Sequence, residues 1–104
     1  MSRLETFLTA LRPLLRKQGA RAAWVFGSHA RGEADAISDI DVIVVASTDQ
    51  PPVERFRDYL PAILEAGVGV DLFVYTPEEF ERMNSEERPF LLTALEHAKL
   101  VYEG

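Results

Sequence analysis

The chain has 104 residues, of which 47% are hydrophobic and 10% aromatic. This size suffices for one hydrophobic core, so we expect a single domain over residues 1–104 and exclude wholesale disorder and a multi-domain enzyme. Eleven Lys and Arg against seventeen Asp and Glu give a formal net charge of −6, which argues against direct binding of nucleic acid.

Cysteine usage and hydropathy indicate the compartment. The chain has no Cys, which excludes disulfides and a Cys nucleophile and favours a reducing environment. Its longest apolar run, residues 42–46, is far shorter than the roughly 18 residues that a membrane span needs, and no signal peptide is visible. We therefore expect a cytoplasmic protein that does not contact membranes.

The first half of the chain predicts one helix and two strands. Residues 4–15 have apolar side chains at helical spacing, with Ser2 as the capping residue. Residues 21–26 and 39–46 are short runs rich in apolar residues, which is typical of buried strands. The intervening residues 27–38 are barely enough for a parallel crossover, so we expect an antiparallel pair with a short helix between its strands.

The second half predicts a third strand and two further helices. A helical stripe over residues 53–64 precedes a strand at 68–75, which favours a parallel crossover from the second strand. Thr76 and the residues after it form a helix start, residues 90–98 predict a final helix, and 99–102 form a short strand or tail. The expected fold is α/β, of the α+β kind: a small three-stranded mixed sheet packed with helices.

Three aspartates occur where strands are expected. Asp39 and Asp41 open the second strand, and Asp71 lies within the third. Because side chains alternate across a strand, Asp39 and Asp41 share one face, and Asp71 joins them if the two strands are neighbours. Converging carboxylates require a cation, and Mg²⁺ suits an all-oxygen set. For Asp39 alone, a strand-end cap or a surface acid is an equally good interpretation.

A glycine bend follows the first strand. Gly27 allows close backbone approach to a ligand, and a helix that begins at Ser28 presents free N–H groups to phosphates. Arg31 adds a cation for the same anion. Such bends are common and mostly structural, but a phosphate cradle beside paired acids is what metal-dependent attack on a nucleoside triphosphate needs.

Together these motifs resemble a known superfamily. GSHARGE at residues 27–33, SDIDVIVV at 38–45 and VDLF at 70–73 are similar to the DNA polymerase beta nucleotidyltransferases, in particular to the minimal nucleotidyltransferase branch. The resemblance implies that Gly27 and Ser28 hold the triphosphate, with Arg31 and Ser38 as further nucleotide-binding residues. It implies that the acids, Asp39, Asp41 and Asp71, are catalytic and bind two Mg²⁺ ions.

The same resemblance implies a reaction and a partner. An acceptor hydroxyl attacks the α-phosphate of ATP and pyrophosphate leaves. The minimal branch resembles antitoxins paired with HEPN-type ribonuclease toxins, so we expect a protein adenylyltransferase that places AMP on a partner's tyrosine, in a homo- or hetero-oligomer. Two alternatives stay open: a non-catalytic nucleotide-binding antitoxin that covers its partner, and the catalytic half of a split small-molecule nucleotidyltransferase.

Other side chains are assigned structural roles. Arginines interspersed with acids predict solvated helix faces; they are Arg55, Arg57, Arg82 and Arg88. Core packing is the favoured role of Trp24 and of the apolar residues Phe80, Met83, Phe90 and Leu91. We assign no chemistry to His29.

Overall fold

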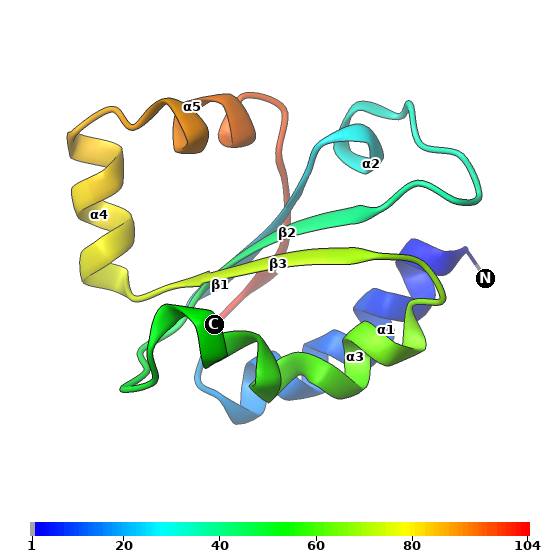
Figure 1. Cartoon of the computed structure of the whole chain (residues 1–104), viewed down its shortest axis with the longest axis horizontal. Helices are drawn as coiled ribbons and strands as arrows, with labels where there is room; N and C mark the ends of the chain where they lie inside the picture. Colours follow the sequence, from blue (N-terminus) through cyan, green and yellow to red (C-terminus); the bar gives the residue numbers. More distant parts are fainter. Residues whose placement is uncertain (1) are drawn as a thin grey trace.

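One mixed sheet organises the computed structural model, which describes residues 2–104 (Figure 1). β1 (Ala22–Phe26) is antiparallel to β2 (Ile40–Val45), and β2 is parallel to β3 (Val70–Tyr75), so both predicted pairings are confirmed. A fourth strand, β4 (Lys99–Glu103), pairs antiparallel with β1 and gives the order β3-β2-β1-β4. The sheet thus has four strands rather than the predicted three. The short segment after residue 98 is a strand because it forms hydrogen bonds with the otherwise free edge of β1.

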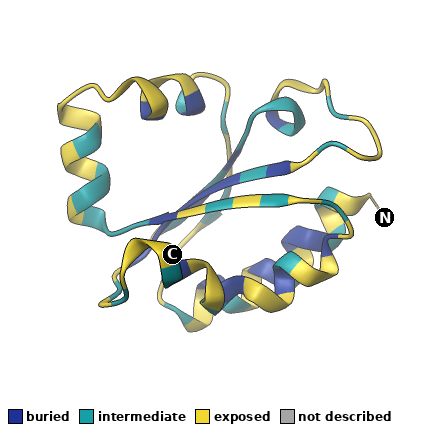
Figure 2. Cartoon of the chain, in the orientation of Figure 1, coloured by how far each residue is buried: buried dark blue, intermediate teal, exposed yellow. Residues whose placement is uncertain are grey.

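The larger core lies on one face of this sheet. α1 (Arg3–Lys17), the 3-10 helix η1 (Pro52–Tyr59) and α3 (Leu60–Glu65) cover that face, below the sheet in Figure 1. Figure 2 shows the buried side of α1 turned toward the strands. Fully buried members of this core are Phe7, Leu11, Leu15, Ile40, Val42 and Val44. Because strand residues alternate, the odd-numbered residues of β2 point to the opposite face.

A smaller apolar cluster lies on that opposite face. α4 (Pro77–Ser85) and α5 (Pro89–Leu95) pack there around the buried Ile43. Trp24 stacks on Phe80 with ring centroids 5.3 Å apart, which confirms that Trp24 belongs to the packing of the protein. Within residues 2–104, no helix combines the length and the apolar character that crossing a membrane requires.

The helix expected at residues 53–64 is divided into η1 and α3. Pro61 is the physical reason, because it has no N–H for an i to i−4 bond and suits the first turn of a new helix. The apolar stripe is correspondingly only half buried. Val53 is 81% exposed and Leu64 is 74% exposed.

Arg55 does not lie on a solvated face, contrary to the prediction. Its side chain is only 7% exposed. The guanidinium donates to the carbonyl oxygens of Gln50 (2.9 Å) and Val74 (3.0 Å) and to both carboxylate oxygens of Glu79 (2.6 and 3.2 Å). The hydrogen bond from Arg55 lowers the pKa of Glu79. Glu79 also forms the capping box of α4 together with Thr76. Local charge patterning could not reveal a pair separated by 24 residues.

Replacing Arg55 should destabilise the fold strongly. We expect Arg55→Ala to lower the free energy of unfolding by about 3 kcal/mol, because it leaves the partly buried Glu79 carboxylate without its ion-pair partner and removes a donor from two carbonyl oxygens. Arg57→Ala is the matched control, since Arg57 pairs with Glu54 on the exposed surface, and it should cost less than about 0.5 kcal/mol. Urea denaturation measures both, and equal losses in the two variants would contradict this assignment.

Candidate active site

The parallel register of β2 and β3 places two carboxylates side by side. Asp41 is the second residue of β2, Asp71 is the second residue of β3, and the two are directly paired. Both point away from the larger core, because the neighbouring Ile40 and Val42 point into it. The predicted meeting of Asp41 and Asp71 on one face of the sheet therefore occurs in the structure.

Repulsion within this pair is visible in the ionisation of Asp41. Its pKa is raised, first by burial, then by the hydrogen bond with Asp71 and by the negative charges of Asp71 and Asp39. His29 acts in the opposite direction and lowers the pKa of Asp41. A half-buried carboxylate with acidic neighbours is a position where positive charge is stabilised.

Asp39 stands slightly apart from the other two acids. It precedes β2, opposite Gly69, whose carbonyl accepts a hydrogen bond from the N–H of Ile40 at 2.9 Å. The carboxylate of Asp39 lies over Gly69, so close that a Cβ there would overlap Oδ1. Among residues 2–104, no three acidic or histidine side chains are close enough to form a metal site as they stand. Asp39 and Asp71 are exposed, which leaves their side chains room to rotate.

The glycine bend lies directly against the acid pair. Gly27 has φ 73° and ψ −150°, a region that is essentially restricted to glycine. A Cβ at this position would overlap the Oδ2 atom of Asp41. Glycine is therefore required at Gly27 both for the backbone conformation and for the space that Asp41 occupies.

The short helix α2 (Ser28–Arg31) starts from this bend. The N–H groups of Ala30 and Arg31 each donate to the carbonyl of Gly27 at 3.1 Å. The first N–H groups of a helix have no acceptor within the helix, and within residues 2–104 those of Ser28 and His29 have no acceptor elsewhere. Two amides therefore remain available beside Asp41.

Two of the predicted nucleotide-binding side chains are engaged with neighbours. Arg31 donates to Glu33 at 3.3 Å on the exposed surface. The hydroxyl of Ser38 donates to the Asp35 carboxylate and accepts from the Asp35 N–H, both at 3.0 Å. Contact of either side chain with a nucleotide would exchange these intramolecular bonds for new ones.

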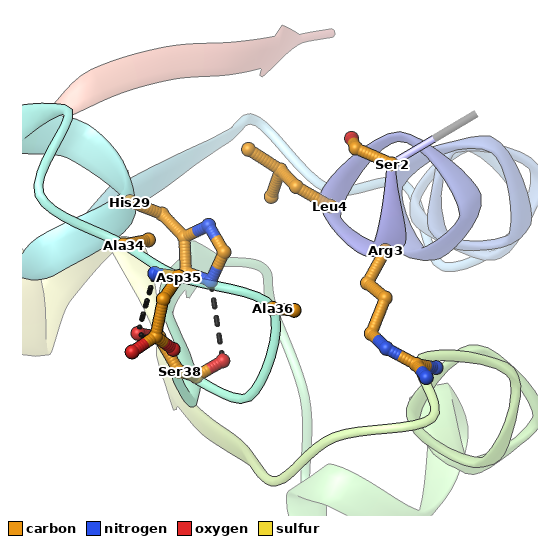
Figure 3. Close-up of a pocket in the computed structure, with 8 residues that line it drawn as sticks. All are labelled: Ser2, Arg3, Leu4, His29, Ala34, Asp35, Ala36 and Ser38. Atoms are coloured by element: carbon orange, nitrogen blue, oxygen red, sulfur yellow. Dashed lines mark hydrogen bonds between the residues drawn. The ribbon is translucent and has the colours of Figure 1, made fainter.

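His29, to which the sequence analysis assigned no chemistry, links the bend to the segment that carries Asp39 and Asp41. Its half-buried imidazole Nε2 lies 3.3 Å from the carbonyl oxygen of Ser38, the residue before Asp39 (Figure 3). His29 thereby connects α2 to the start of β2. The only sequence signal was its place two residues after Gly27, which by itself is uninformative.

A cavity of about 520 Å³ lies behind this link, between the start of α1 and the loop before β2 (Figure 3). Its lining comprises Ser2, Arg3, Leu4, His29, Ala34, Asp35, Ala36 and Ser38. None of the three aspartates singled out from the sequence lines it. The acid pair and the glycine bend therefore lie outside this cavity.

Comparison with known proteins identifies this arrangement. The nucleotidyltransferase domain family matches residues 4–91. Protein adenylyltransferase MntA of Thermococcus cleftensis is 40% identical over 76 residues, which are 69% of this chain and 74% of that protein. The chain therefore belongs to the nucleotidyltransferase domain family, as the resemblance of its motifs implied.

Solved structures agree on the fold. A toxin–antitoxin crystal structure with AMP-PNP matches 93% of this chain and 73% of its own, with a TM-score of 0.68 and 19% identity. The complex of tri-AMPylated Shewanella oneidensis HEPN toxin with MNT antitoxin matches 96% of this chain and 72% of its own, with a TM-score of 0.62 and 17% identity. The predicted α+β nucleotidyltransferase fold is confirmed.

Proposed function

We propose that this nucleotidyltransferase transfers AMP from ATP to a tyrosine hydroxyl of a HEPN-type toxin and thereby acts as an antitoxin. The observation that carries the proposal is the acid pair of Asp41 and Asp71 in register beside the bend at Gly27, whose conformation is essentially restricted to glycine. The 40% identical relative is a protein adenylyltransferase, and one structure of the same fold is an antitoxin in complex with an AMPylated HEPN toxin. Both support this choice of donor and acceptor.

The acids fit Mg²⁺ by their chemistry. All three side chains offer only oxygen ligands. Burial and the neighbouring acids raise the pKa of Asp41, and a divalent cation would offset both effects. Asp39 and Asp41 would hold Mg²⁺, and Asp71 would complete the set after rotation of the exposed side chains. Bound there, Mg²⁺ supplies neutralisation of the charge that develops on the phosphate oxygens.

The remaining steps belong to residues of the chain. The free amides of Ser28 and His29 bind the triphosphate at the Gly27 bend, and Arg31 and Ser38 reach the same anion once they leave Glu33 and Asp35. Asp71 accepts the proton of the acceptor hydroxyl. That oxygen attacks the α-phosphate while the bond to pyrophosphate breaks, so orientation and charge stabilisation supply the catalysis.

Label transfer tests the proposal. The chain is incubated with Mg²⁺, ATP labelled at the α-phosphate and the HEPN-type protein encoded beside it, and label is sought on a tyrosine. We expect transfer that needs both the metal and the partner, and that is lost in the double variant Asp39→Ala, Asp41→Ala. An unlabelled partner, or undiminished labelling by the double variant, would defeat the proposal.

One observation favours a second function. Because the three aspartates are not close enough to hold a metal as they stand, the chain could neutralise its partner by covering it, with nucleotide as a structural ligand. The same double variant separates the two functions. A covering antitoxin keeps full neutralisation and complex formation in that variant, whereas an enzyme loses neutralisation although the complex still forms.

A further inference from the structure

Three phenylalanine rings from distant parts of the chain meet beside the acid pair. Phe26 ends β1, Phe73 lies in β3 and Phe90 lies in α5. The ring centroid of Phe90 lies 5.9 Å from that of Phe26 and 5.2 Å from that of Phe73, and both contacts are edge to face. Phe26 and Phe73 are themselves 6.2 Å apart, so each ring contacts the other two.

The cluster is only partly covered. Phe90 is 43% exposed and Phe73 is 38% exposed, which differs from the core packing expected for Phe90. Single exposed apolar residues are ordinary, but rings that contact one another and border a polar site mark a binding surface. Both neighbouring rings contact Phe90, while 43% of this residue remains exposed.

The sheet register places the cluster next to the acids. Phe26 pairs directly with Asp41, and Phe73 follows Asp71 by two residues and so lies on the same face. Phe26 and Phe73 are therefore neighbours of the two carboxylates on one face of the sheet.

A cavity of about 460 Å³ joins the rings to the glycine bend. Its lining includes Phe26 and Phe90 together with Gly27 and Arg31, and Thr93 of α5 is a polar neighbour. This volume lies within the range of small-molecule sites, which combine apolar walls with a few polar groups. The same cavity thus borders both the glycine bend and two of the aromatic rings.

We propose that Phe90, braced by Phe26 and Phe73, stacks on the nucleobase of the donor nucleotide. This inference rests on the proposed function, because it takes the triphosphate to lie on the Gly27 bend. A nucleoside attached to that triphosphate extends along the cavity, and aromatic side chains stack on bases of any kind.

The position of the cavity favours the donor over the acceptor. In an in-line displacement the attacking hydroxyl approaches from the side opposite to the leaving pyrophosphate. Pyrophosphate leaves from the bend, so a cavity that contains Gly27 lies on the donor side. An acceptor tyrosine ring would approach from the opposite side, where Asp71 is exposed.

Binding titrations without any acceptor test the inference. Dissociation constants for AMP-PNP and for inorganic tripolyphosphate, both with Mg²⁺, are measured by calorimetry on the full chain. We expect Phe90→Leu to weaken AMP-PNP binding about tenfold and to leave tripolyphosphate binding unchanged, since only the nucleotide has a base to stack. Leu92→Ala is the matched control: Leu92 lies on the same helix, is 47% exposed and does not line the cavity, so neither constant should change.

A second variant keeps the test independent of how Phe90→Leu folds. Phe90→Trp preserves an aromatic face, so we expect AMP-PNP binding to be retained and the tryptophan fluorescence to change with AMP-PNP but not with tripolyphosphate. The inference is wrong if Phe90→Leu leaves AMP-PNP binding unchanged, weakens both ligands equally, or alters only the KM for the protein acceptor. A chain that binds AMP-PNP in this manner but labels no partner would overturn the proposed function and leave the stacking role intact.

Discussion

Asp41→Asn should lower the rate of AMP transfer about 1,000-fold, because a carboxylate that binds a catalytic metal contributes several kcal/mol and each 1.36 kcal/mol is a factor of ten. The amide has nearly the same shape, so the loss reports charge rather than packing. The measurement is the initial rate of labelling of the partner at saturating ATP and Mg²⁺.

The same substitution should stabilise the metal-free fold. Burial and the neighbouring acids raise the pKa of Asp41 above its ordinary value of 3.8. The folded state then binds the proton more tightly than the unfolded state, so stability falls as pH rises from 3.8 through the folded pKa, and the cost is present at pH 7. Asn carries no charge and removes this cost, so its melting temperature at pH 7 should be higher than that of the original chain.

The response of the melting temperature to Mg²⁺ tests whether Asp41 binds the metal. Mg²⁺ should raise the melting temperature of the original chain by binding the folded state, and should raise that of Asp41→Asn much less. Asp49→Asn is the control, because Asp49 is an exposed acid in the loop after β2, and it should change neither the rate nor the response to Mg²⁺. If Asp41→Asn kept both the original transfer rate and the original rise in melting temperature with Mg²⁺, Asp41 would not be a ligand of the metal.

Gly27→Ala should reduce AMP transfer about 100-fold or more. The substitution forces a side chain into a backbone region that is essentially restricted to glycine, at a cost of about 1–3 kcal/mol. The new Cβ also overlaps Oδ2 of Asp41, so either the carboxylate turns away from Asp71 or the bend moves. Displacing a reacting group by about 1 Å is sufficient for a loss of this size.

Gly32→Ala provides the matched control for Gly27→Ala. Gly32 also has φ 73°, but its ψ of 20° is an ordinary left-handed conformation, and no atom lies within 4 Å of a Cβ built there. We expect a stability loss of about 1–2 kcal/mol with transfer within about threefold of the original. Both are measured by urea denaturation and by labelling rates, and equal rates for the two variants would remove the Gly27 bend from the active site.

The sequence by itself determined the class of fold and the pairings of β1 with β2 and of β2 with β3, and it singled out the residues of the candidate site. The spacing of two residues between Asp39 and Asp41 predicts that they share one face, because side chains along a strand alternate with a period of two. Residues 27–38 are barely enough for a parallel crossover, which favours an antiparallel pair, and the pairing of β1 and β2 is antiparallel. These features are local in the chain, so residue order is enough to specify them.

Only the tertiary structure decided the features that join distant segments. The pairing of Asp41 with Asp71, the ion pair of Arg55 with Glu79, the edge strand β4 and the contact of Phe90 with Phe26 and Phe73 all depend on register and on packing between elements. From their neighbours in the chain, Arg55 was expected on a solvated helix face and Phe90 in the core. In the fold Arg55 is buried and Phe90 is 43% exposed. The burial and the charge partner of a side chain depend on its neighbours in space. Those neighbours come from distant parts of the chain, so local sequence does not reveal them.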